Sequence, residues 1–212
     1  MTISNLFLCV VAQGFAATLA LGQSSNSTEA SRLPRQSTAF VQSLYRQIVA
    51  RHPTGLPQGA DMEVLAPYLS KRLLHRIELS RACAGDWVRQ DQKRMLSNNQ
   101  VPEKAPFGWA ESGLFSGADE RTEPDAFVIE RTEAEKDGSI RVFVKLTLSS
   151  PPSETWKVAI VVVRENGHSV VDDVIYPMDK SDPSDVWLSK LLSHGCDGPH
   201  WVGFGHGRPN TK

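Results

Sequence analysis

The chain has 212 residues, with 23 basic and 24 acidic side chains and a formal net charge of −1 at pH 7. This balance excludes the basic excess by which nucleic-acid-binding proteins are usually recognised. A chain of this length normally forms one domain with a sizeable core, and the sequence contains no internal repeat.

The first 22 residues have the features of a secretory signal peptide. The uncharged apolar run from Leu6 to Leu21 is 16 residues long, shorter than the about 20 residues that a membrane-spanning helix needs. It is followed by Gly22, and small residues at the −3 and −1 positions suit a signal peptidase. We expect cleavage between Gly22 and Gln23, and export to the periplasm or medium without membrane attachment. The alternative, a buried N-terminal helix, would show a polar face.

Two cysteines, Cys83 and Cys196, remain after this cleavage. An even number of cysteines in an oxidising compartment favours a disulfide bond. A Cys83–Cys196 bond would close a loop of roughly 110 residues and stabilise the fold by several kcal/mol if loop entropy dominates. The alternative is a pair of buried free thiols.

The N-terminal half of the mature chain has helical patterns. Residues 23–36 are polar and Ser-rich, which predicts a flexible linker. From Ser37 or Thr38 to about His52, apolar residues recur at spacings of three and four, which predicts an amphipathic helix. Glycines and prolines end this helix.

Two further helical segments are expected before the strands. A short helix is predicted over 62–68, with Asp61 as its cap. Another begins at Ser70 and is interrupted at Gly85, with a continuation capped by Asp86.

After Pro102 the pattern changes to that of strands. Alternating β-branched segments are separated by turn sequences, of which Asn166-Gly167 is the strongest hairpin signal because both residues tolerate positive φ angles. Residues 111–115 are expected to add a short first strand, and Asp182-Pro183-Ser184 to begin a final helix carrying Val186 and Trp187. The main predicted strands are 126–131, 140–148, 155–164 and 168–176.

Helices followed by hairpin-linked strands predict an α+β fold. We expect N-terminal helices packed on a curved antiparallel sheet of four or five strands, followed by a C-terminal helix. The predicted organisation is a signal peptide over 1–22, a linker over 23–36, one domain over 37–193 and an irregular tail over 194–212 that is tethered by the disulfide.

The strand pair 155–167 and 171–176 resembles the last hairpin of a cone-shaped α+β superfamily that includes ketosteroid isomerase, the SnoaL-like proteins and nuclear transport factor two. The segments 40–45 and 68–74 resemble, within it, exported bacterial proteins called domain of unknown function 3828. The resemblance implies a conical cavity that is an active site in some relatives and a binding surface or packed core in others, so it does not by itself assign a function.

Asp173 is the first candidate for chemistry. Neighbouring strand residues point to opposite faces, so Asp172 and Asp173 are not expected to act as a pair. Asp173 is expected to share a face with Ser169, Val171 and Ile175, where it is a candidate general base. Its alternatives are to cap a helix or to pair with an arginine. Tyr45 is an alternative catalytic residue if its hydroxyl enters the cone, but its spacing is typical of core packing.

The C-terminal tail contains the weak alternative of a metal site. His194, Cys196, His200 and His206 are ligands that would suit zinc or copper, but their spacing fits no standard closed zinc site. We therefore expect no metal and no other cofactor.

Charge is unevenly placed along the chain. The stretch 71–94 has seven basic and three acidic residues, whereas 119–137 has eight acidic and three basic residues. These stretches are interpreted as solvated faces, with a bipolar surface for a protein partner as the alternative.

The leading hypothesis is an exported, non-enzymatic binding or interaction domain whose partner is an unidentified protein or a small apolar ligand. The alternative is an isomerase-, lyase- or hydrolase-like enzyme that uses the cone cavity with Asp173 as its base.

Overall fold

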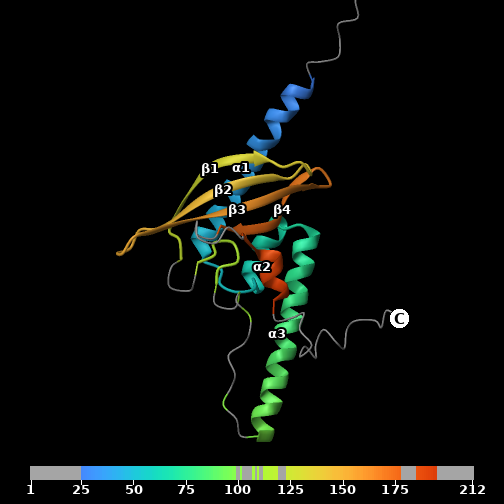
Figure 1. Cartoon of the computed structure of the whole chain (residues 1–212), viewed down its shortest axis with the longest axis vertical. Helices are drawn as coiled ribbons and strands as arrows, with labels where there is room; N and C mark the ends of the chain where they lie inside the picture. Colours follow the sequence, from blue (N-terminus) through green and yellow to red (C-terminus); the bar gives the residue numbers. More distant parts are fainter. Residues whose placement is uncertain are drawn as a thin grey trace, which may run out of the picture.

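The computed structural model describes residues 25–98, 101, 107, 109, 112–118, 123–177 and 185–194. Helices precede an antiparallel sheet in the chain, which confirms the predicted α+β class (Figure 1). The helices are α1 (Ser25–Arg51), α2 (Gly59–Leu65), the 3-10 helix η1 (Ala66–Tyr68), α3 (Lys71–Asn98) and α4 (Leu188–Ser193). The strands are β1 (Ala126–Ala134), β2 (Ile140–Leu148), β3 (Glu154–Glu165), β4 (His168–Tyr176) and β5 (Val186–Trp187).

The sheet has the order β1-β2-β3-β4-β5, and every neighbouring pair is antiparallel. Alternation of side chains predicted the bounds of β2 and β4, and both are confirmed. The β3–β4 hairpin turns at Asn166 and Gly167, whose φ angles are 51° and 83°. Positive φ at both central residues is the requirement of a type I′ turn, as the sequence predicted.

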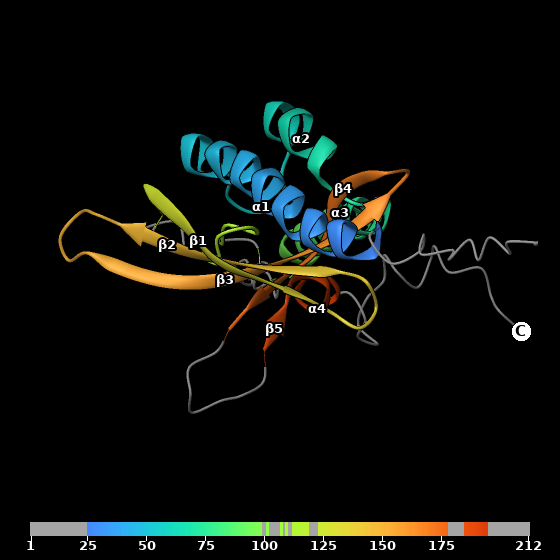
Figure 2. The same cartoon turned by 90° about the horizontal axis from the view of Figure 1, so that it is seen from above.

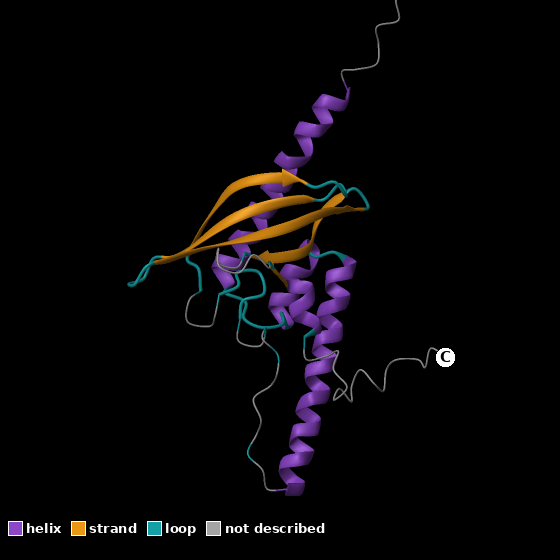
Figure 3. Cartoon of the chain, viewed as in Figure 1, coloured by secondary structure: helices purple, strands orange, loops and turns teal. Residues whose placement is uncertain are grey.

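The main core lies between α1 and the sheet. The residues Val41, Leu44 and Ile48 recur on one face of α1, and all three are buried with the inward residues Val142 and Val144 of β2. Figure 2 shows α1 and α2 on one side of the sheet, with β5 and α4 towards the other side. The last helix, α4, contacts both α3 and β4, and α3 itself contacts β4. The N-terminal end of α3 lies near the sheet, whereas its C-terminal half extends beyond the other elements (Figure 3).

Residues 25–36 differ from their prediction, because they form the first part of α1 and not a linker. The helix is held on the core by the buried face that includes Val41. Adding residues to an existing helix is far less costly than starting one, so a polar segment can continue it. Pro34 lies inside the helix and lacks a donor, but its carbonyl accepts a 2.9 Å hydrogen bond from Thr38 Oγ1.

Gly85 does not interrupt the third helix, contrary to the prediction. It lies inside the continuous α3, so Asp86 is not a helix cap. A glycine in a helix interior costs about 1 kcal/mol relative to alanine, which burial of neighbouring turns can offset. Ile77 and Cys83, on the turns before Gly85, are both buried.

Two other predicted elements have a different form. Val186 and Trp187 belong to β5, where they pair with Tyr176 and Ile175, and the final helix begins at Leu188. Their β-branched and aromatic side chains suit an edge strand better than a helix. The predicted strand over 111–115 is instead a bridge at Gly113 followed by a turn.

Candidate functional site

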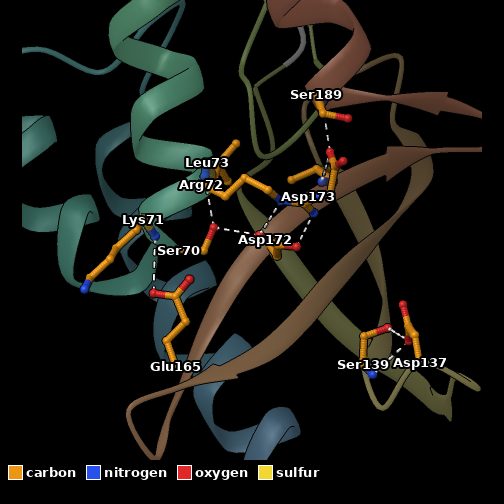
Figure 4. Close-up of polar contacts among 11 residues, drawn as sticks. Ser70, Lys71, Arg72, Leu73, Asp137, Ser139, Glu165, Asp172, Asp173 and Ser189 are labelled. Carbon is orange, nitrogen blue, oxygen red and sulfur yellow. Dashed lines mark hydrogen bonds and ion pairs between the residues drawn. The ribbon is translucent and has the colours of Figure 1, made fainter.

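A polar network joins the start of α3 to β4. Ser70 Oγ donates to Asp172 Oδ1 at 2.8 Å and accepts the backbone N–H of Leu73 at 2.9 Å, so Ser70 caps α3 while it contacts the sheet. Arg72 donates to the same carboxylate through Nε at 2.9 Å, and its second nitrogen contacts Asp172 Oδ2 (Figure 4). The hydrogen bond to Asp172 raises the pKa of Arg72. Asp172 is therefore a structural anchor.

A β-bulge places Asp172 outside the regular pairing of β3 and β4. Val171 lies opposite Val162, but Asp173 lies opposite Val161, so the register shifts by one residue. Cross-strand partners share a face, and Val161 and Val162 point to opposite faces. Asp173 therefore points away from the face of Val171.

This bulge corrects the expectation that Asp173 shares a face with Ser169 and Val171. Val162 and Val171 belong to the main core, whereas Asp173 shares its face with Ile175. Strict alternation along β4 fails because one bulged residue inverts every face beyond it.

The carboxylate of Asp173 holds the start of α4. Its Oδ1 accepts the backbone N–H of Ser189 at 3.0 Å and that of Val174 at 2.9 Å (Figure 4). The residue is 3 % exposed. The first N–H groups of a helix have no partner within the helix, and a carboxylate oxygen satisfies one of them here. Of the alternatives open from the sequence, helix capping is the observed one.

Tyr45 is packed and does not reach Asp173. It is fully buried, and its hydroxyl donates to the carbonyl of Phe115 at 2.6 Å. Burial raises its pKa well above the usual value, and Tyr176 raises it further. No hydrogen bond between described residues joins Tyr45 to Asp173. The two candidate catalytic side chains therefore bond to different backbone groups, Tyr45 to Phe115 and Asp173 to Ser189, and not to each other.

The segment 112–118, which we call the plug, receives three aromatic donors. Tyr45 donates to Phe115 O, Tyr176 donates to Leu114 O, and Trp156 Nε1 donates to Ser116 O at 2.7 Å. These donors come from α1, β4 and β3, and they hold three successive carbonyl groups.

Apolar packing completes the plug. Leu114 and Phe115 are buried in the main core beside Tyr45. Gly117 has φ 66°, and a Cβ at this position would lie 2.7 Å from Cδ1 of Tyr176. The plug therefore fills the space between the sheet and α1 at this end of the domain. Sequence reasoning missed it, although the apolar pair Leu114-Phe115 between two glycines is its signal.

A pocket of about 440 Å³ lies at the other end of β4, beside the β3–β4 turn. One wall comes from α1 and η1 and the opposite wall from the hairpin. The sequence does not indicate this pocket, because its walls come from segments that lie far apart in the chain. Its lining residues are Gln36, Phe40, Pro67, Arg164, Gly167, His168 and Ser169.

One of the two cysteines of the predicted disulfide lies in the described part of the chain. Cys83 is 1 % exposed on α3, whereas Cys196 lies outside the described residues. The predicted cleavage positions Gly22 and Gln23 also lie outside them.

Of the proposed metal ligands, His194 ends the described part of the chain, and His200 and His206 lie beyond it. Within the described ranges, no three His, Cys, Asp or Glu side chains are grouped to hold a metal ion. None of the helices described combines the length and the apolar character of a membrane span.

The charged stretches form ion pairs locally. Asp86 pairs with Arg89 inside α3, and Glu130 of β1 pairs with Lys157 of β3 at 2.7 Å. Glu135 pairs with Arg141 at 3.0 Å across the β1–β2 turn. These contacts favour the interpretation of solvated faces.

No protein-family model, curated protein or solved structure matches this chain.

Proposed function

We propose that this chain is an exported domain that acts by binding and not by catalysis. The observation that carries the proposal is the state of Asp173, whose carboxylate is buried and accepts two backbone N–H groups. A general base must reach the proton that it removes, within about 3 Å or through one water. Asp173 is 3 % exposed and its Oδ1 already accepts these two N–H groups, which disfavours that role.

The plug supports the same proposal. An enzyme that used the space between α1 and the sheet would need room there for a substrate, but Leu114 and Phe115 are buried in it. Tyr45, the other candidate, donates its hydroxyl proton to the backbone of the plug. The pocket at the β3–β4 turn offers an accessible concave surface instead.

The alternative function is an isomerase-, lyase- or hydrolase-like enzyme with Asp173 as base, and one experiment separates it from binding. The mature protein, residues 23–212, is screened with small molecules for a rise in melting temperature. Each stabilising molecule is then incubated with the protein and examined by NMR. A ligand recovered unchanged supports binding. A ligand that is converted, with conversion abolished in an Asp173→Asn variant of unchanged stability, would overturn the proposal.

Export and membership of the cone-shaped superfamily, in particular its domain of unknown function 3828, are parts of the same proposal. The apolar segment before Gln23 supports export, and the order of helices and antiparallel strands supports the family resemblance. Expression in a bacterial host with a periplasm, followed by N-terminal sequencing, tests export directly. We expect the periplasmic protein to begin at Gln23, and material that retains Met1 would contradict this.

A further inference from the structure

We propose that the pocket beside the β3–β4 turn binds a small carboxylate that carries an apolar group. This inference rests on the proposed binding function and names its ligand class. The pocket is lined by one arginine, one histidine, an amide, a hydroxyl and an aromatic ring, and no acidic side chain is among its described lining residues. The composition suits an anion with an apolar body, because binding sites combine apolar walls with a few polar groups that fix orientation.

Arg164 is positioned for this role by the pocket itself. One of its terminal nitrogens donates to Gln36 Oε1 at 3.0 Å, and the other donates to the carbonyl of Gly167. The bond to Gln36 connects the hairpin to α1, and both bonds restrict the guanidinium before any ligand arrives. A guanidinium has further N–H donors in a planar fork, which matches the geometry of a carboxylate.

The acidic side chains closest in sequence to the pocket already accept hydrogen bonds from other parts of the protein. Glu165, next to Arg164, accepts the backbone N–H of Lys71 at 3.3 Å. Asp172 pairs with Arg72 and accepts the hydroxyl of Ser70. Arg164 forms no ion pair with a described carboxylate, so its charge remains available for an anion from solution.

An apolar wall faces these polar groups. Phe40 and Pro67 line the pocket, and the ring of Phe40 packs on Tyr68 with 5.6 Å between ring centroids. Tyr68 is held by a 2.9 Å hydrogen bond with Ser43. Tyr68 therefore holds the ring of Phe40 in place. Phe40 and Pro67 offer a surface for the aromatic or aliphatic part of a ligand next to the guanidinium of Arg164.

The test is NMR titration of the ¹⁵N-labelled mature protein with three matched probes. Phenylacetate has both parts of the inferred ligand, phenylacetamide lacks the charge, and acetate lacks the apolar group. We expect phenylacetate to bind at least about tenfold more tightly than phenylacetamide, the amount expected from one charge-assisted hydrogen bond. It should also bind at least about tenfold more tightly than acetate, because acetate buries no phenyl ring. Its shift changes should centre on Gly167, His168 and Ser169.

Arg164→Gln is expected to weaken phenylacetate binding about tenfold. Arg131→Gln, at another exposed arginine of the sheet, serves as the matched control and should bind as the wild type does. Equal binding of phenylacetamide, shift changes centred elsewhere, or full binding by a folded Arg164→Gln variant would overturn the inference. Those results leave the binding function intact if other ligands stabilise the protein, whereas chemical conversion of phenylacetate would contradict the binding function itself.

Discussion

The Oδ1 atom of Asp173 lies 3.0 Å from the backbone nitrogen of Ser189, and this contact joins β4 to α4. The carboxylate can meet α4 because the bulge at Asp172 turns the next residue away from the main core. The same bulge lets Asp172 meet Ser70 and Arg72 at the start of α3. Two adjacent carboxylates thus anchor two different helices to one strand.

Removal of the Asp173 carboxylate should mainly reduce stability. Asp173→Ala leaves the N–H groups of Val174 and Ser189 without this acceptor, and we expect the free energy of unfolding to fall by about 2–3 kcal/mol. Asp173→Asn keeps an acceptor oxygen but loses the charge, so a fall of about 1 kcal/mol is expected, since charged bonds are roughly twice as strong as neutral ones. Urea denaturation measures both. Glu154→Gln, at an exposed site of β3, is the control, and equal stability of all four proteins would contradict the anchoring role.

The plug gives a prediction with a matched pair of glycines. Gly117 and Gly138 both have positive φ angles, 66° and 85°, but a Cβ at Gly117 would overlap Tyr176 whereas one at Gly138 would meet nothing within 4 Å. Gly138→Ala is expected to cost about 1–2 kcal/mol for the backbone alone. Gly117→Ala adds overpacking, for a total of about 2–5 kcal/mol. Thermal or urea unfolding of the two variants compares them, and equal losses would show that Tyr176 moves aside freely.

The strands could be predicted well from the sequence because their burial is one-sided. In β2, the residues Ile140, Val142, Val144 and Leu146 are all buried and alternate with partly exposed ones, so the period of two is unbroken. The Asn166-Gly167 turn was equally predictable, since few residue pairs adopt two positive φ angles.

The bulge and the plug could not be predicted in the same way. The shift of register at Asp172 leaves the composition of β4 unchanged, and only its partner strand reveals it. The plug depends on contacts between distant residues, such as Tyr45 with Phe115 and Trp156 with Ser116. No local pattern encodes such pairs. The pocket has the same origin, because it joins α1 to a hairpin more than a hundred residues later.

The buried tyrosines predict a loss of stability in alkali. Burial raises the pKa of Tyr45 and of Tyr176 above 10 in the folded state, so both stay protonated there while the unfolded chain ionises near pH 10. The unfolded state then binds fewer protons, and the stability present below pH 10 is lost as the pH rises further. Each tyrosine should contribute a slope of about 1.4 kcal/mol per pH unit.

Tyr176→Phe separates this effect from a general alkaline effect. The variant should be less stable than the wild type at pH 8, by about 1 kcal/mol, because Leu114 O loses its donor. Above pH 10 its stability should fall less steeply than that of the wild type. Urea denaturation at several pH values measures the slopes, and parallel slopes for the two proteins would show that Tyr176 ionises without unfolding.

The last prediction concerns the proposed Cys83–Cys196 disulfide, which the contact between α3 and α4 makes geometrically reasonable. Ser80 Oγ donates to Leu192 O at 2.6 Å, and Cys83 is one helical turn after Ser80. Cys196 follows Ser193, the last residue of α4, by three residues, and an extended chain of that length spans up to about 11 Å. A bond to Cys83 therefore requires no change in α4 if the chain after it turns towards α3.

We expect the native mature protein, purified from an oxidising compartment, to react with no thiol reagent until it is reduced. Reduction should lower the free energy of unfolding by about 3–5 kcal/mol, the effect expected for a loop of roughly 110 residues. Cys196→Ser is the appropriate variant, because replacement of the buried Cys83 would also leave a cavity. Its stability should equal that of the reduced wild type within about 0.5 kcal/mol. Labelling of both cysteines without reductant would rule out the bond, and a Cys196→Ser variant as stable as the oxidised wild type would show that the bond does not stabilise the fold.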